Sequence, residues 1–125
     1  MVTLGQTFRF QVEGAHLWTV ITTPDGHEGT FVMVNVTTFA AHKDTSCVLH
    51  AGDHPDIQHD SVIYYADARA WWNVGPNGHD YWTGQGQIEQ RDPLNNAILR
   101  RIQDGALASP FFKRKFIPLV QTCLV

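Results

Sequence analysis

The chain has 125 residues, of which 43% are hydrophobic and 17% charged, and this is the size and composition of one folded globular domain. Its formal net charge of −3 excludes a general electrostatic attraction to nucleic acid or to an anionic membrane. No apolar run approaches the ~20 residues that span a bilayer, so we expect no membrane partner.

The charge is distributed unevenly along the chain. Residues 1–85 contain three Lys or Arg against nine Asp or Glu, whereas residues 86–125 contain six against three. An anionic partner would therefore approach the C-terminal part or a patch near it. The alternative is a basic face that is simply solvated.

The cysteines and the N-terminus favour a cytoplasmic protein. Residues 1–6 lack a basic region followed by an apolar run, so no signal peptide is expected there. Cys47 and Cys123 are too few for a zinc site or a disulfide framework, and we expect both thiols to be reduced.

The first part of the chain reads as a series of short strands. The turn sequence Pro24-Asp25-Gly26 separates two of them, and residues 30–38 form a β-branched run typical of a central strand buried on both faces. The expected strands cover residues 6–12, 16–22, 30–38, 47–49 and 61–66, with 68–72 either prolonging the last one or bending away.

The second part of the chain changes character. Residues 73–90 are rich in glycine and are expected to form a mobile loop, and Asp92-Pro93 predicts the start of a helix over 92–108. The tail over 109–125 is basic and aromatic, and its end could form a last strand or an ordered tail. Together these elements predict a mainly β, small antiparallel barrel over residues 5–72, capped by one late helix, in a single domain.

Three side chains at strand ends are the first candidates for chemistry. His16 begins the second strand, where a neutral imidazole can accept a proton and its protonated form can stabilise an anion. Thr37 and Thr38 close the central strand, and the one facing away from the core could bond a phosphate or an oxyanion. The alternatives are a structural histidine and two threonines that only favour the strand.

A second candidate is a metal site in the polar segment that follows residue 49. The four side chains with suitable ligand atoms are His50, Asp53, His54 and His59. Their spacing matches no known signature, and the alternative is a set of loop histidines with an aspartate that forms turns. We therefore expect no metal, and a metal-dependent hydrolase is the third hypothesis.

Adjacent aromatic residues at Trp71-Trp72 and Tyr81-Trp82 are the third candidate. Neighbouring side chains on a strand point to opposite faces, so at least one of each pair should be exposed. Exposed aromatics could stack bases or anchor a protein partner, and the alternative is that they seal the ends of the barrel.

Ser61 has no nucleophile-elbow sequence around it, and no glycine-rich phosphate loop is present.

The order of these segments resembles the PemK-like and MazF-like toxins of bacterial toxin–antitoxin pairs. The similar segments are Gly5-Gln6 with Phe8 and Phe10, residues 16–21, residues 34–38, and residues 60–63. The resemblance implies an SH3-like barrel, a homodimer, a cognate antitoxin partner, and cleavage of single-stranded RNA without metal or cofactor.

The chain departs from the family where the family has its catalytic arginine, because His16 stands in that place. The resemblance assigns catalysis to His16 with Thr37 or Thr38, and substrate binding to Ser61. Arg9 and Arg69 are possible substitutes for the phosphate contact, and Trp71 and Trp72 are candidates for stacking bases.

Two functions follow from these observations. The leading hypothesis is a metal-independent endoribonuclease in which the 2′-hydroxyl attacks the adjacent phosphate. The alternative is a non-catalytic interaction module with the same barrel, which the missing arginine and the acidic first 85 residues favour.

Overall fold

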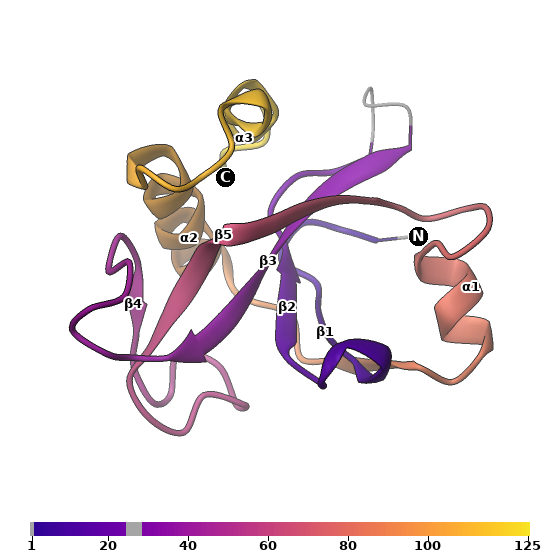
Figure 1. Cartoon of the computed structure of the whole chain (residues 1–125), viewed down its shortest axis with the longest axis horizontal. Coiled ribbons are helices and arrows are strands. Elements are labelled where there is room, and N and C mark those ends of the chain that lie inside the picture. Colours follow the sequence, from indigo (N-terminus) through magenta and orange to yellow (C-terminus); the bar gives the residue numbers. More distant parts are fainter. Residues whose placement is uncertain (1, 25–28) are drawn as a thin grey trace.

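The computed structural model describes residues 2–24 and 29–125, and it is mainly an antiparallel sheet with a helix late in the chain (Figure 1). Asp25 and Gly26 of the turn expected after Pro24 lie outside the described residues. The elements in chain order are β1 (Thr7–Phe10), the 3-10 turn η1 (Gln11–Glu13), β2 (Leu17–Val20), β3 (Thr30–Thr38), β4 (Val48–Leu49), β5 (Ser61–Trp72), α1 (His79–Gly84), β6 (Ile88–Arg91), α2 (Asn96–Ala108), the 3-10 turn η2 (Arg114–Phe116) and α3 (Ile117–Thr122).

The six strands form one curled sheet with the order β4-β5-β3-β2-β1-β6, a half-barrel in which every neighbouring pair is antiparallel. β3 has the predicted bounds and lies between β5 and β2, and its residues from Phe31 to Asn35 are buried. The prediction of a central strand buried on both faces is therefore confirmed for this stretch.

β5 is longer than the six residues predicted from residue 61, because residues 68–72 prolong it. The pairing of β5 with β3 is interrupted between Met33 and Asn35, which pair with Arg69 and Tyr64. β5 carries more residues than β3 across this irregularity, so the strand bends there. It consequently contributes to two separate parts of the core.

The core consists of two clusters of buried side chains. The larger one joins the sheet to α2, α3 and the C-terminal segment, and it includes Tyr65, Ile102 and Val120. The smaller one is aromatic and includes Phe8, Trp18 and Trp71. Figure 1 shows α2 and α3 at one end of the curled sheet and α1 at the other.

The segment expected as a loop over 73–90 instead contains α1 and β6. His79 is buried and contacts the rings of Phe8 and Trp71 edge-on, at centroid distances of 5.4 and 5.8 Å. Its burial lowers the pKa of the imidazole. The six-residue helix α1 is thus stabilised by tertiary packing. The glycine-rich local sequence predicts a loop there because it contains no signal of that packing.

α2 begins three residues later than an N-cap at Asp92 predicts. Asn95 is the N-cap, since its Oδ1 accepts a hydrogen bond of 2.9 Å from the backbone amide of Ile98. The carbonyl of Asp92 accepts instead from the Thr7 hydroxyl, at 2.6 Å, so this segment is docked on the sheet before the helix starts. The predicted end of this helix at residue 108 is confirmed.

The C-terminal segment is helical and not a last strand. η2 and α3 bury Phe116 and Val120 against the larger cluster. Within the described parts of the chain, no helix is both long and apolar enough to cross a membrane.

Candidate functional site

A pocket of about 270 Å³ opens where three neighbouring strands end. The start of β2, the end of β3 and the start of β5 meet at this edge, because Trp18 pairs with Asn35 and Thr38 pairs with Ser61. The loop before β5 and one side chain of β1 complete the walls. The lining residues are Arg9, Ala15, His16, Leu17, Val36, Thr37, Thr38, Asp56, Ile57, Gln58, His59 and Ser61.

The turn between η1 and β2 positions His16. Gly14 and Ala15 both have left-handed backbones, with φ of 79° and 58°, and the alanine carries strain of ~1 kcal/mol that glycine would not. The imidazole of His16 is exposed and folds over Gly14, where a Cβ would meet its Cδ2 and Nε2 at 3.7 Å. Across the described residues, neither ring nitrogen of His16 has a hydrogen-bond partner. Both nitrogens are thus available to a ligand.

Arg9 reaches the pocket from β1. Its Nη1 donates to the carbonyl of Ala15 at 2.8 Å, and its Nη2 lies 3.4 Å from Oδ2 of Asp56. Arg91 binds the same carboxylate through two shorter bonds, of 2.8 and 2.9 Å, and its hydrogen bond lowers the pKa of Asp56. Asp56 is thus bound mainly by Arg91. The remaining N–H groups of the Arg9 guanidinium can donate to an anion in the pocket.

Thr37 and Thr38 differ in how they are held. Lys43 Nζ donates to Oγ1 of Thr37 at 3.1 Å and to the carbonyl of Thr38 at 2.8 Å. The Thr37 hydroxyl accepts from the ammonium group, so its own proton is directed elsewhere and can be donated. Thr37 is half-buried, whereas Thr38 is exposed.

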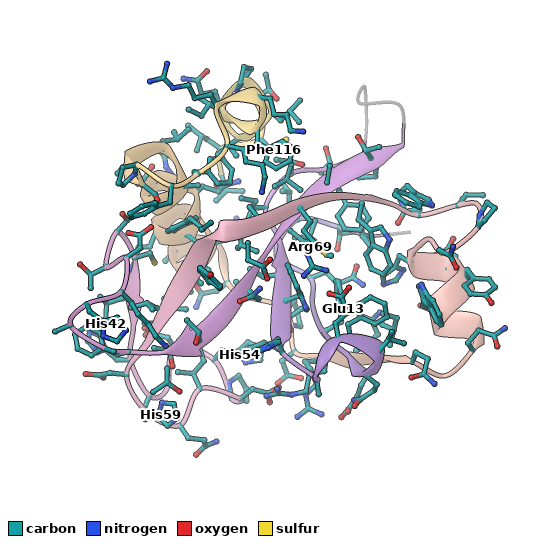
Figure 2. The ribbon with its side chains drawn as sticks, in the orientation of Figure 1. Glu13, His42, His54, His59, Arg69 and Phe116 are labelled. Atoms are coloured by element: carbon teal, nitrogen blue, oxygen red, sulfur yellow. The ribbon has the colours of Figure 1, made fainter. Side chains whose placement is uncertain are left out.

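The loop before β5 is anchored by His54. Its Nδ1 accepts from the amide of Asp56 at 3.0 Å, which leaves the proton on Nε2 for the carbonyl of Asp92, at 2.5 Å. This buried histidine ties the loop to the segment before α2, and Figure 2 shows it in the middle of the molecule.

His59 lies further along the same loop, at the pocket. Its Nδ1 is 3.2 Å from the carbonyl of Asp60 and donates to it, so Nε2 of the neutral ring is an acceptor. Ser61 Oγ donates to the carbonyl of His59 at 2.9 Å. Ser61 therefore lines the pocket, but its hydroxyl proton is used in a hydrogen bond that holds the loop.

Arg69 is not at the pocket. It forms ion pairs with Glu13 and Asp67, and its guanidinium lies 4.8 Å from the ring centre of Trp18. Figure 2 shows Arg69 and Glu13 pointing toward one another, well away from His59. Of the two arginines suggested for the phosphate contact, the structure brings only Arg9 to His16 and Thr37.

The tryptophans expected to stack bases are also elsewhere. Trp71 is buried, stacks on Phe10 at 5.2 Å, and donates from Nε1 to the carbonyl of Asn77. Trp72 covers Gly78, where a Cβ would lie 2.7 Å from the indole. One of each aromatic pair is exposed as predicted, namely Trp72 and Tyr81. Trp72 ends β5 and Tyr81 lies in α1, and neither of them lines the pocket.

The four residues of the metal alternative do not form one ligand set. His54 is engaged through both nitrogens, His50 Nδ1 contacts Oδ1 of Asp60 at 2.9 Å, and Asp53 Oδ2 accepts from the amide of His50. No group of three or more His, Cys, Asp or Glu suited to a metal ion is found among residues 2–24 and 29–125.

Three residues of this region escaped the sequence reasoning. The sequence pattern suggests His59 only as a metal ligand, and it assigns no role at the site to Asp56 or Lys43. The roles of Asp56 and His59 depend on how the loop before β5 folds back toward β1, a contact between segments more than 40 residues apart that periodicity does not encode. Lys43 differs, because it lies six and five residues from Thr37 and Thr38, to which it donates. The proximity of His59 to a strand start at Ser61 is a local signal for that residue.

No family model, no curated protein and no solved structure matches this chain.

Proposed function

We propose that the chain is a metal-independent endoribonuclease that cleaves single-stranded RNA at the pocket formed by β2, β3 and the loop before β5. The observation that carries the proposal is the convergence of Arg9, His16 and Thr37 on one pocket, from three different strands or strand ends. A guanidinium, a free imidazole and an available hydroxyl are the groups that phosphodiester transesterification uses.

The reaction is attack of the ribose 2′-hydroxyl on the adjacent phosphorus. The attacking oxygen loses its proton to an imidazole, a P–O bond to the 2′-oxygen forms, and the P–O bond to the 5′-oxygen of the next nucleotide breaks. The leaving oxygen takes a proton from a second acid. The products carry a 2′,3′-cyclic phosphate and a 5′-hydroxyl, and no water or metal is consumed.

The pocket offers a group for each of these needs. His16 and His59 flank the end of β3, so one can accept the proton while the other, protonated, donates one. Arg9 and the Thr37 hydroxyl would contact the phosphate oxygens as negative charge accumulates on them. His59 extends the role that the resemblance assigns to His16 alone.

The PemK-like or MazF-like identity belongs to the same proposal. The sheet with its late helix is compatible with the SH3-like barrel of those toxins, and His16 stands where they have arginine. An antitoxin partner, a homodimer and a cytoplasmic location follow only if that identity holds.

The test is cleavage of a panel of single-stranded RNAs in EDTA by the wild-type protein and by His16→Ala. We expect cleavage by the wild type and a loss of about 100-fold or more in the variant, the usual contribution of a general acid or base. Because His16 is exposed, its removal should leave the melting temperature unchanged.

The matched control is His50→Ala, which removes another exposed imidazole outside the pocket. It should cleave at the wild-type rate. A wild-type protein that leaves every RNA intact, or a His16→Ala protein as active as the wild type, would contradict the proposal.

A further inference from the structure

A second groove, of about 490 Å³, lies directly beside the pocket on the outer face of the sheet. Thr37 borders both, so the two hollows adjoin at the end of β3. The groove is lined by Thr37, His42, Lys43, Asp44, Val62, Ile63, Tyr64, Ala66 and Phe111.

The groove displays two exposed aromatic rings. Thr37 pairs with Val62 and Asn35 pairs with Tyr64, so Tyr64 projects from the same face as the Thr37 hydroxyl. Its side chain is 49% exposed, and Phe111, which follows α2, is 59% exposed. An aromatic side chain standing open on a sheet face offers its π-surface to another planar group.

Positively charged side chains lie at this aromatic surface and follow it in the sequence. Lys43 lines the groove and donates to the neutral oxygens of Thr37 and Thr38, and among the described residues no carboxylate pairs with it. Lys113 comes two residues after Phe111 and donates to the carbonyl of Ala68 on β5, and Arg114 and Lys115 follow it in the sequence. The carboxylate of Asp44, also at the groove, accepts from Ser46 and Ser109.

We propose that this groove binds an unpaired nucleobase of a single-stranded RNA, with Tyr64 and Phe111 stacking on the base while Lys43 and the segment 113–115 contact the flanking phosphates. The inference rests on the proposed function, because Thr37 borders both hollows and a base in the groove would lie next to the phosphate that is cleaved. RNA would also be the anionic partner expected for the basic C-terminal part of the chain.

The combination of residues favours a single strand over a duplex. Stacked aromatics with cations along the backbone are the usual way in which proteins hold single strands, and any base can be accepted because each has a π-face. In a duplex the faces of each base are covered by its neighbours, so the base must be unpaired before it can enter the groove.

The experiment measures binding of a fluorescently labelled single-stranded RNA of ten nucleotides, 2′-O-methylated throughout so that no attack can occur. We expect Tyr64→Ala and Phe111→Ala each to weaken binding by roughly 5- to 100-fold, the range typical of one lost base stack. Tyr64→Phe should bind like the wild type, because the ring is kept. A fully paired duplex should bind more weakly and be insensitive to Tyr64→Ala.

The matched control is Tyr81→Ala, since Tyr81 is similarly exposed, at 44%, but lies on α1 away from the groove. It should not alter binding. Equal RNA binding by the wild type and by the double variant Tyr64→Ala/Phe111→Ala would contradict the proposal that the groove binds RNA. A change in the sedimentation mass of the double variant would also contradict it, since the surface would then be a contact between two copies of the chain.

The outcomes separate this inference from the proposed function. If the wild type cleaves RNA but binding does not depend on Tyr64, the proposed base-binding role of the groove is wrong and the proposed cleavage at the pocket is retained. If binding depends on Tyr64 but no RNA is cleaved under any condition, the groove stands as a binding surface and the nuclease proposal fails.

Discussion

At the scale of single residues, the two threonines at the end of β3 should not be equivalent. Lys43 directs the proton of the Thr37 hydroxyl away from itself, whereas the described residues provide no such partner for the Thr38 hydroxyl. We expect Thr37→Val to lower kcat for RNA cleavage by about 100-fold, the scale of one lost oxyanion donor, and Thr38→Val to lower it far less. Steady-state kinetics on one RNA substrate compares them.

Thr37→Ser serves as the control for this prediction, because it keeps the hydroxyl and removes only a methyl group. It should retain most of the activity. Equal losses in Thr37→Val and Thr38→Val, or an inactive Thr37→Ser, would rule out the role given to the Thr37 hydroxyl.

Asp56 should make stability depend on pH in the acid range. The hydrogen bond from Arg91 lowers the pKa of Asp56 below ~3.9, its value in an unfolded chain. The carboxylate therefore contributes stability that is present above ~pH 3.9 and is lost as the pH falls through the lower folded pKa. We expect Asp56→Asn to be less stable than the wild type at neutral pH, with the difference shrinking in acid.

Urea unfolding at several pH values measures this difference. Asp104→Asn is the control, because Asp104 forms only an exposed ion pair with Arg100 along α2. A free-energy gap between wild type and Asp56→Asn that stays constant down to ~pH 2 would show that the ion pair with Arg91 does not hold Asp56 in its charged form.

The positions of residues near strand ends could be predicted wherever the strand itself could be predicted. β-branched runs with a turn between them place His16 and Thr37 at neighbouring strand ends, and this is where they lie. Arg69 shows the limit of such reasoning. Its distance from Thr37 depends on the irregular pairing of β5 with β3, and its ion pair with Glu13 spans 56 positions.

At the scale of elements, the packing of α2 on the sheet depends on Gly105. A Cβ at this position would lie 2.2 Å from the Tyr65 hydroxyl and 2.8 Å from Cβ of Cys47. The Tyr65 hydroxyl cannot easily withdraw, since it donates to the carbonyl of Ile102 at 2.7 Å. Gly105→Ala should therefore destabilise the protein by about 1–3 kcal/mol, although alanine is favoured by ~1 kcal/mol inside a helix.

Gly84→Ala is the matched control, because Gly84 is also helical and nothing lies within 4 Å of a Cβ there. It should be neutral or stabilise by up to ~1 kcal/mol. Chemical unfolding of both variants tests the pair. A Gly105→Ala protein as stable as Gly84→Ala would mean that α2 is not packed this closely on β5.

The elements divide into those with a strong local pattern and those without one. β3 and the end of α2 were predicted because local sequence specifies them. The first is a nine-residue β-branched run, and the second is followed by Ser109 and Pro110, where proline disfavours a helical residue before it. α1 and β6 were missed, since the first is held by the burial of His79 and the second by its pairing with β1. Gly105 lies inside α2, where its lack of a side chain permits the helix to approach Tyr65.

At the scale of the whole molecule, the fold explains how an acidic chain could bind an anion. The curled sheet gathers His16, Arg9 and the Thr37 hydroxyl at one pocket, while Phe8 and Phe10, the neighbours of Arg9 in β1, belong to the buried aromatic cluster. Lys43 lines the adjoining groove, and Lys113 donates to the carbonyl of Ala68 on β5, which borders that groove through Tyr64 and Ala66. Net charge alone does not describe such a local arrangement.

The most direct test of the central claim uses a DNA oligonucleotide that contains a single ribonucleotide, incubated with the wild-type protein in EDTA. Our account predicts one cut, on the 3′ side of the ribonucleotide, with a 2′,3′-cyclic phosphate on one product and a 5′-hydroxyl on the other. Cuts at deoxynucleotides, products with a 5′-phosphate, or an intact oligonucleotide would contradict it.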